Sequence, residues 1–241
     1  LHAYTHELNV TPLGGNTVFF KKTWLDIFAK EDLVDGYRVW DEEGLTEDGD
    51  IGIRLTQMGA NIQIVYDAVQ ATQEETPDSI EQFVKQRTRW NQGFYQIFAK
   101  GVWRELPTLK QRITAIYVLL NSLLQASIML FLPVGVFIAL TQEVPVPIAI
   151  ISYIPIYILI FQLMLNMIGL REFTDAYGMK IPFLFRLKML VSFYPYQLML
   201  SFSALRAIGR FLTNQSSWEK TTHSNLHRQS SESSNAHAGA Q

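Results

Sequence analysis

The sequence predicts an α/β domain followed by all-α transmembrane helices, and three observations support this fold class. Residues 1–112 combine strand-like and helix-like apolar spacing with most of the acidic residues of the chain. Residues 113–170 are almost continuously apolar, with Glu143 as their only charge. The formal net charge of −2 over 241 residues gives no sign of nucleic-acid binding, and the lack of cysteine excludes disulfides and thiolate metal sites.

Within residues 1–112, two short apolar runs are typical of strands. Residues 16–20 follow a Gly-Gly pair, and residues 61–66 alternate between polar and apolar side chains. Helical spacing is found at residues 22–33 and 50–59, the second ending in a glycine. Two strands are too few to close a doubly wound sheet, so we expect the first half of this domain to precede the chain.

Residues 76–101 predict a long helix. Thr76 or Asp78 can cap its N-terminus, and Pro77 suits its first turn. Gly101 is expected to end it, because glycine adopts the left-handed backbone conformation that often follows the last helical residue.

Two spans predict a transmembrane hairpin over residues 113–170. Residues 114–140 contain no charge and would reach about 40 Å as a helix, which exceeds the roughly 30 Å hydrocarbon core of a bilayer. Residues 146–169 form the second span, after a short polar turn. A buried helix of a soluble protein is the alternative, but adjacent charge-free runs of this length are rare in soluble proteins.

The basic residues that flank the hairpin predict its orientation. They are Arg104, Lys110 and Arg112 before it, and Arg171, Lys180, Arg186 and Lys188 after it. The positive-inside rule then places residues 1–112 in the cytosol, in a protein integral to the plasma or inner membrane. Residues 171–212 contain a basic loop and a third helix, which either spans the membrane or lies in its interface. Residues 213–241 are polar, and we expect a mostly disordered cytosolic tail.

An acidic stretch at residues 42–50 raises the question of function. It contains five carboxylates in nine residues, and Asp48-Gly49-Asp50 satisfies the pattern D-x-D, which can hold a divalent cation. The same stretch can supply a catalytic base. It can also be an ordinary loop in which Asp48 or Asp50 caps the following helix.

Two further motifs flank this stretch. Gln86, Arg89 and Trp90 fit the pattern Q-x-x-R-W, although an amphipathic helix with a core tryptophan would show the same residues. Gly14-Gly15-Asn16 precedes a predicted strand and can be read as a simple turn.

The order of these motifs resembles that of the processive family-2 glycosyltransferases, which include the cellulose, chitin and hyaluronan synthases. G-G-N is followed by T-E-D-x-D at residues 46–50, then by Q-x-x-R-W and by paired membrane helices, so the resemblance covers roughly residues 10–170. It implies that residues 1–112 are the C-terminal part of a cytosolic glycosyltransferase-A-type, Rossmann-like domain. It also implies inverting transfer from a nucleotide sugar, a UDP- or GDP-sugar, to the growing end of a β-linked polysaccharide.

The resemblance assigns roles to individual residues. Asp48 corresponds to the catalytic base, and Glu47 shapes its loop. Thr46 and Glu47 also count among the residues that would bind the donor diphosphate or the acceptor. Gln86 and Arg89 would bind the donor diphosphate, for which the donor fork of arginine is well suited. Trp90 would stack against the acceptor sugar.

Two other segments receive roles in the same way. Gly14, Gly15 and Asn16 would lie beside the acceptor, where bare backbone allows a close approach. Residues 218–223 fit W-x-K-T-x-H, which implies that Lys220 and Thr221 close over the donor, although Glu219 stands where glycine is usual. If this tail returns to the site, it must be cytosolic.

The resemblance also implies a divalent cation, magnesium or manganese, bound mainly by residues outside this chain. The acceptor is a carbohydrate or a lipid-linked sugar at the bilayer. Two alternatives stay open: a non-processive transferase that acts on a lipid carrier or membrane lipid, and a non-catalytic transporter or scaffold. Q-x-x-R-W disfavours the first alternative, and the second leaves Asp48, Arg89 and Trp90 unexplained.

Overall fold

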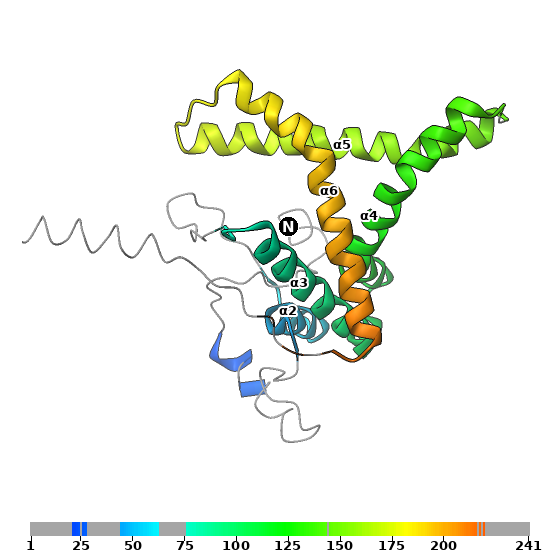
Figure 1. Cartoon of the computed structure of the whole chain (residues 1–241). Helices are drawn as coiled ribbons and strands as arrows, with labels where there is room; N and C mark the ends of the chain where they lie inside the picture. Colours follow the sequence, from blue (N-terminus) through cyan, green and yellow to red (C-terminus); the bar gives the residue numbers. More distant parts are fainter. Residues whose placement is uncertain are drawn as a thin grey trace, which may run out of the picture.

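The computed structural model describes residues 21–24, 26–27, 44–62, 76–143, 145–215, 217 and 219. Its main elements, in chain order, are α2 (Glu47–Gln57), α3 (Ile80–Lys100), the short 3₁₀ helix η2 (Val102–Glu105), α4 (Leu109–Thr141), α5 (Val146–Ala176) and α6 (Phe183–Leu212). Figure 1 shows α3 between α2 and the C-terminal half of α6, with α5 extending away from this group.

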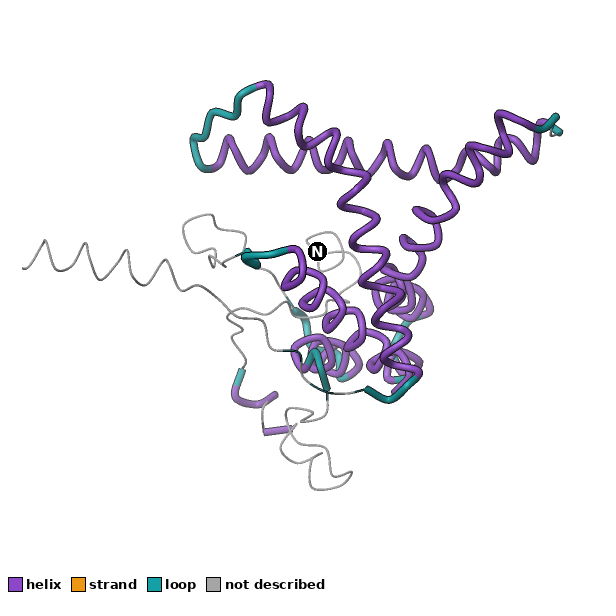
Figure 2. Tube along the Cα trace, in the orientation of Figure 1, coloured by secondary structure: helices purple, strands orange, loops and turns teal. Residues whose placement is uncertain are grey.

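The α/β prediction is wrong for the residues that the structure describes. They form helices joined by turns, and none of them lies in a strand (Figure 2). The prediction depended on residues 16–20 and 61–66, of which only Asn61 and Ile62 are described, both in an irregular segment after α2. The physical reason is that the apolar residues of α2 and α3 recur at helical spacing, and those on one side, such as Ile53 and Ile97, are buried against other helices. The Rossmann-like sheet implied by the resemblance is therefore not found in these ranges.

Helix α2 begins earlier than the apolar pattern predicted. Thr46 occupies the N-cap position, so neither Asp48 nor Asp50 caps the helix, and both lie in its first turn. Carboxylates are favourable there, because the N-terminal end of a helix carries a partial positive charge. The predicted stop is confirmed, since Gly59 follows the helix with a φ of 82°.

Helix α3 begins at a different cap and ends where predicted. Ser79 is its N-cap, and the Ser79 hydroxyl accepts a hydrogen bond of 3.2 Å from the Gln82 backbone N–H. Thr76 and Asp78 therefore precede the cap, and Pro77 lies outside the first turn. Gly101 ends the helix in the left-handed conformation, with a φ of 80°.

A shared apolar core joins α2, α3 and α4. Ile53 of α2, Ile97 of α3 and Leu106 are almost completely buried together with Ala115 and Leu119 of α4. The first three turns of α4 therefore pack on the other helices. We conclude that the base of the predicted membrane hairpin and the preceding helices form one packed unit.

Helices α4 and α5 are long and apolar enough to cross a membrane. The candidate spans are Leu109–Ile138 and Val146–Ala176, with mean hydropathies of 1.9 and 2.3, so both helices extend beyond the predicted spans. In α4, 22% of the most apolar window is buried, compared with 6% in α5. This small burial leaves the apolar side chains of α5 available to lipid or to other helices.

Helix α6 covers α3 and α4. Gln197, Ser201, Ser203, Ala204 and Ala207 are buried in this contact. The α6 helix also forms side-chain contacts with α4, including a hydrogen bond between the side chains of Gln125 and Gln197. One side of its C-terminal half is therefore buried against α3 and α4, while Phe202, Leu205 and Leu212 are exposed.

Candidate active site

One face of α3 contacts the acidic stretch at residues 45–50. The Leu45 backbone N–H donates a hydrogen bond of 3.1 Å to Gln96 Oε1. Gly93 lies so close to Thr46 that a Cβ atom at position 93 would be 2.2 Å from Thr46 Oγ1. Lys100 Nζ lies 3.3 Å from Asp50 Oδ1.

These contacts follow the spacing of a helix. Positions 93, 96 and 100 are three and four residues apart, as is position 89 before them, so they form one stripe along α3. The stripe fixes the register of the acidic stretch against the helix that carries Q-x-x-R-W.

Arg89 couples this stripe to the predicted catalytic base. Burial lowers the pKa of the Arg89 guanidinium, whereas the neighbouring carboxylates of Glu47 and Asp48 act to raise it. The structure therefore brings the T-E-D segment and Arg89 into one electrostatic environment. A half-buried cation beside a partly exposed carboxylate can counter negative charge that develops on a bound phosphate.

Asp48 and Asp50 differ sharply in their surroundings. Asp50 is 3% exposed, and its carboxylate lies between Lys100 and Arg54, 4.0 Å from the latter. Asp48 is only partly buried, and its Oδ1 accepts a hydrogen bond of 2.9 Å from the Gly49 backbone N–H. Asp50 therefore stabilises the packing of α2 on α3, whereas Asp48 keeps part of its surface exposed.

Trp90 lies in a small aromatic and cationic stack. The Arg87 guanidinium carbon lies 4.5 Å from the centroid of the Trp90 ring and 5.1 Å from that of Phe83. Arg87 thus covers one face of the half-buried indole and fixes its orientation. Gln86 is half-buried one helical turn before Trp90.

A second face of α3 binds the segment that follows α6. The Gln92 side chain is 2% exposed, donates a hydrogen bond of 2.7 Å to the Gln215 carbonyl, and accepts one of 3.0 Å from Arg210 Nε. Four residues before Arg210 on α6, the Arg206 guanidinium donates hydrogen bonds to Glu219. The chain therefore returns from α6 to the helix that carries the Q-x-x-R-W motif.

The remaining predicted site residues lie outside the described part of the chain. They are Gly14, Gly15, Asn16, Lys220 and Thr221. Within the described ranges, no group of three or more His, Asp or Glu side chains could hold a metal ion. The described residues thus offer no ligand set for the divalent cation that the sequence resemblance implies.

Sequence reasoning missed the residues that position the predicted site. Gly93 lies inside a strong helical pattern, and a glycine in such a place often marks the close approach of another segment of the chain. Arg206 and Arg210 interrupt the apolar pattern of residues 189–212, which by itself does not indicate a partner for them. Their partner Glu219 was noticed only as a departure from a motif, and no local pattern connects it with Gln92.

Comparison with known proteins adds to these observations. Residues 4–170 match the family described as glycosyl transferase family group 2. The matched range contains the acidic stretch, all of α3 and α4, and most of α5. No curated protein and no solved structure matches the chain. The chain therefore belongs to glycosyl transferase family group 2, and it is a glycosyltransferase that transfers a sugar with inversion from a nucleotide-sugar donor to an acceptor.

Proposed function

We propose that the protein is a processive synthase that extends a β-linked polysaccharide at the membrane, with Asp48 as the catalytic base. The observation that carries this proposal is the packing of the first turn of α2 on α3. Thr46 lies against Gly93, and Asp50 Oδ1 lies 3.3 Å from Lys100 Nζ, so that Glu47 and Asp48 are charged neighbours of Arg89. A base for the acceptor and a cation for the leaving group must lie on either side of one reacting carbon. The meeting of α2 and α3 provides both groups within one small region.

In the proposed reaction, Asp48 removes the proton from an acceptor hydroxyl group as its oxygen attacks the anomeric carbon of the donor. The bond between that carbon and the diphosphate breaks on the opposite face, and the electron pair leaves with the diphosphate. Arg89 offsets the negative charge that develops there, and Gln86 donates a hydrogen bond. Thr46, as the N-cap, and Glu47 begin the helix whose first turn presents Asp48.

The proposed acceptor site lies at Trp90. One indole face contacts Arg87, which leaves the ring held in place as a platform for a pyranose. A sugar bound there after each transfer is the end that receives the next sugar, which is the requirement for processive synthesis. Gly14, Gly15 and Asn16 are proposed to approach the same acceptor, and Lys220 and Thr221 the donor.

The proposed topology follows from the helices. We propose that α4 and α5 form the transmembrane hairpin, that residues 1–112 lie in the cytosol, and that the membrane helices contribute to a conduit for the product. The lengths and hydropathies of both helices support spanning. The family commonly uses a divalent cation, but no step is assigned to it, since the described residues provide no ligands for one.

The test is a transfer assay with the full-length protein in membranes. Radiolabelled UDP- and GDP-sugars are supplied separately, and the products are sized by gel filtration after lipid extraction. Labelled polymer of high molecular weight supports the proposal. A single-sugar lipid would instead identify a transferase that acts on a lipid carrier or membrane lipid, and no labelled product from any donor would overturn the proposed synthesis.

The Asp48→Asn variant tests the assignment of the base. We expect transfer to fall by at least about a hundredfold, the range of general base catalysis, while donor affinity measured by calorimetry stays unchanged. Asp175→Asn is the matched control, because Asp175 is an exposed carboxylate whose contact is a surface ion pair with Arg171. Undiminished transfer by a correctly inserted Asp48→Asn protein would remove Asp48 from this role.

A further inference from the structure

We propose that Arg206, Arg210, Gln92 and Glu219 form a clamp that positions the segment after α6 beside the donor-binding face of α3. These four side chains are named the tail clamp here. They act through the segment that they hold, so they are positioning residues rather than catalytic ones. The proposal rests on the function proposed above, because it assigns the clamp to donor binding.

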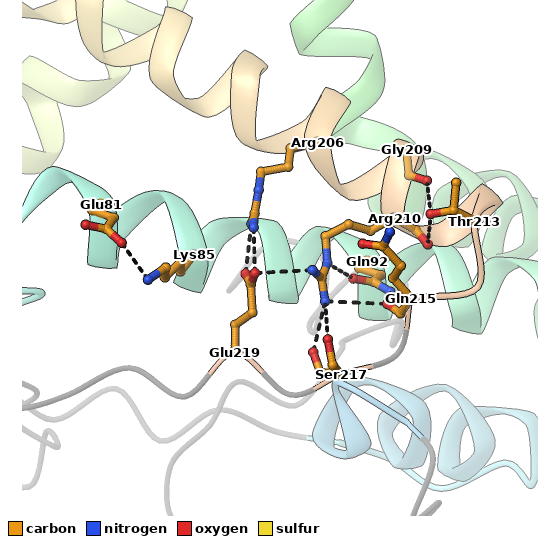
Figure 3. Close-up of polar contacts among 10 residues, drawn as sticks. All are labelled: Glu81, Lys85, Gln92, Arg206, Gly209, Arg210, Thr213, Gln215, Ser217 and Glu219. Atoms are coloured by element: carbon orange, nitrogen blue, oxygen red, sulfur yellow. Dashed lines mark hydrogen bonds and ion pairs between the residues drawn. The ribbon is translucent and has the colours of Figure 1, made fainter.

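The first half of the tail clamp is a two-pronged ion pair. Arg206 Nη1 and Nη2 donate hydrogen bonds of 2.8 and 2.5 Å to the two carboxylate oxygens of Glu219 (Figure 3). Arg210 Nη1 adds a third hydrogen bond, of 3.2 Å, to the same carboxylate. Because Arg206 and Arg210 are four residues apart on α6, their side chains converge on one acceptor.

The second half of the tail clamp binds the backbone of the returning segment. Arg210 Nη2 donates a hydrogen bond of 2.9 Å to the Ser217 carbonyl, and Gln92 donates one to the Gln215 carbonyl. Arg210 Nε in turn donates to Gln92 Oε1. Gln92 and Arg210 therefore determine where the segment after α6 lies along the length of α3.

Burial distinguishes the tail clamp from an ordinary surface ion pair. The side chains of Arg206, Arg210 and Glu219 are 30%, 12% and 20% exposed. In the neighbouring pair of Lys85 and Glu81, by contrast, the carboxylate is 75% exposed. Exposed pairs contribute little, whereas charge-assisted, two-pronged hydrogen bonds of partly buried groups are stronger and more specific in geometry.

The location of the tail clamp connects it with donor binding. Gln92 lies two residues after Trp90 on α3. At the other end of the Q-x-x-R-W motif, Lys85 directly precedes Gln86 and contributes electrostatically to Glu219. The segment held by the clamp thus runs along the part of α3 that carries the residues proposed to bind the donor diphosphate. Holding it there would order the donor site before the substrate arrives, which lowers the entropic cost of binding.

The kinetic test uses Arg206→Gln, Glu219→Gln and the double variant in the membrane transfer assay. We expect each single variant to raise the KM for the nucleotide sugar about tenfold, the scale of one lost charge-assisted contact, with little change in the KM for the acceptor. The double variant should be no worse than either single variant, because the two residues act on each other. Asp175→Asn, which removes an exposed carboxylate paired with Arg171, is the matched control and should leave both KM values unchanged.

Hydrogen exchange of residues 213–219 provides the second measurement. We expect faster amide exchange there in Glu219→Gln than in the unaltered protein, with unchanged exchange in α4. Unaltered donor KM values in the clamp variants of an active enzyme would overturn the proposal, and so would equal losses for donor and acceptor. If the unaltered protein transfers no sugar, the proposed function fails and this assignment fails with it, while faster exchange would still establish the clamp as a structural contact.

Discussion

Gly93 of α3 lies directly against Thr46, the N-cap residue of α2. A Cβ atom at position 93 would be 2.2 Å from Thr46 Oγ1 and 2.5 Å from Thr46 Cγ2, which is closer than such atoms can approach. The absence of a side chain at this position therefore sets the distance between the acidic stretch and the Q-x-x-R-W helix.

We expect Gly93→Ala to displace Thr46, and with it Asp48, from Arg89. The stability should fall by about 1–3 kcal/mol, the usual cost of overpacking, although alanine is the better helix former. Transfer should fall more than the loss of folded protein explains. Thermal unfolding and the transfer assay measure the two effects. Gly209→Ala is the control, since a Cβ atom there meets no atom within 4 Å, and its stability should be unchanged or slightly higher.

Asp48 and Asp50 should respond oppositely to the same substitution. Asp50→Asn removes the buried partner of Lys100 and should cost about 3 kcal/mol or more in folding free energy, while the folded fraction keeps its transfer rate. Asp48→Asn should leave the unfolding temperature nearly unchanged and abolish most of the transfer. Measuring unfolding temperature and rate per folded molecule for both variants separates the roles. Similar profiles for the two variants would contradict the distinction.

Arg87 should affect the acceptor more than the donor. Arg87→Met removes the guanidinium from the Trp90 ring while keeping much of its apolar stem. A contact of this kind is worth about 0.5–1 kcal/mol at partly exposed sites, so we expect the acceptor KM to rise about two- to fivefold. Kinetics with a soluble oligosaccharide acceptor measure this change. A rise in the donor KM alone would place Trp90 on the donor side.

The tail clamp should depend on pH in a defined direction. Hydrogen bonding from Arg206 holds the pKa of Glu219 below its usual value of 4.5, with partial opposition from burial. A carboxyl group whose pKa falls on folding contributes stability above its unfolded pKa and loses it as the pH falls through the folded pKa. The difference in amide protection between the unaltered protein and Glu219→Gln should therefore be constant above about pH 4.5 and disappear in more acid solution. A difference that persists unchanged at pH 3 would show that the charge of Glu219 is not involved.

The helices were more predictable from sequence than the packing between them. Gly59 and Gly101 ended their helices as predicted, because a left-handed backbone conformation is a local requirement that glycine meets. Local patterns placed the start of α3 only approximately, since Thr76, Asp78 and Ser79 are all suitable caps. Ser79 is the cap in the structure, because its hydroxyl group accepts a hydrogen bond from the Gln82 backbone N–H.

The contacts that arrange the candidate site depend on distant segments. Gln92 and Gln215 are 123 positions apart, and no periodicity in either segment indicates that they meet. The resemblance to the family implied that Asp48 and Arg89 lie in one site, whereas their distance along the sequence did not. The two strand predictions, over residues 16–20 and 61–66, lie outside the described residues except for Asn61 and Ile62, which are irregular. A short apolar run suits a strand and a helix equally well, so the sequence alone does not decide between them.

The two faces of α3 bind different parts of the chain. One face seats residues 45–50, and the other holds α6 and residues 215–219. A rotation of α3 about its own axis would therefore disturb the contacts on both faces at once. The acidic stretch and the segment after α6 are therefore both positioned by the same helix, so a shift of α3 along its axis would change both sets of contacts together.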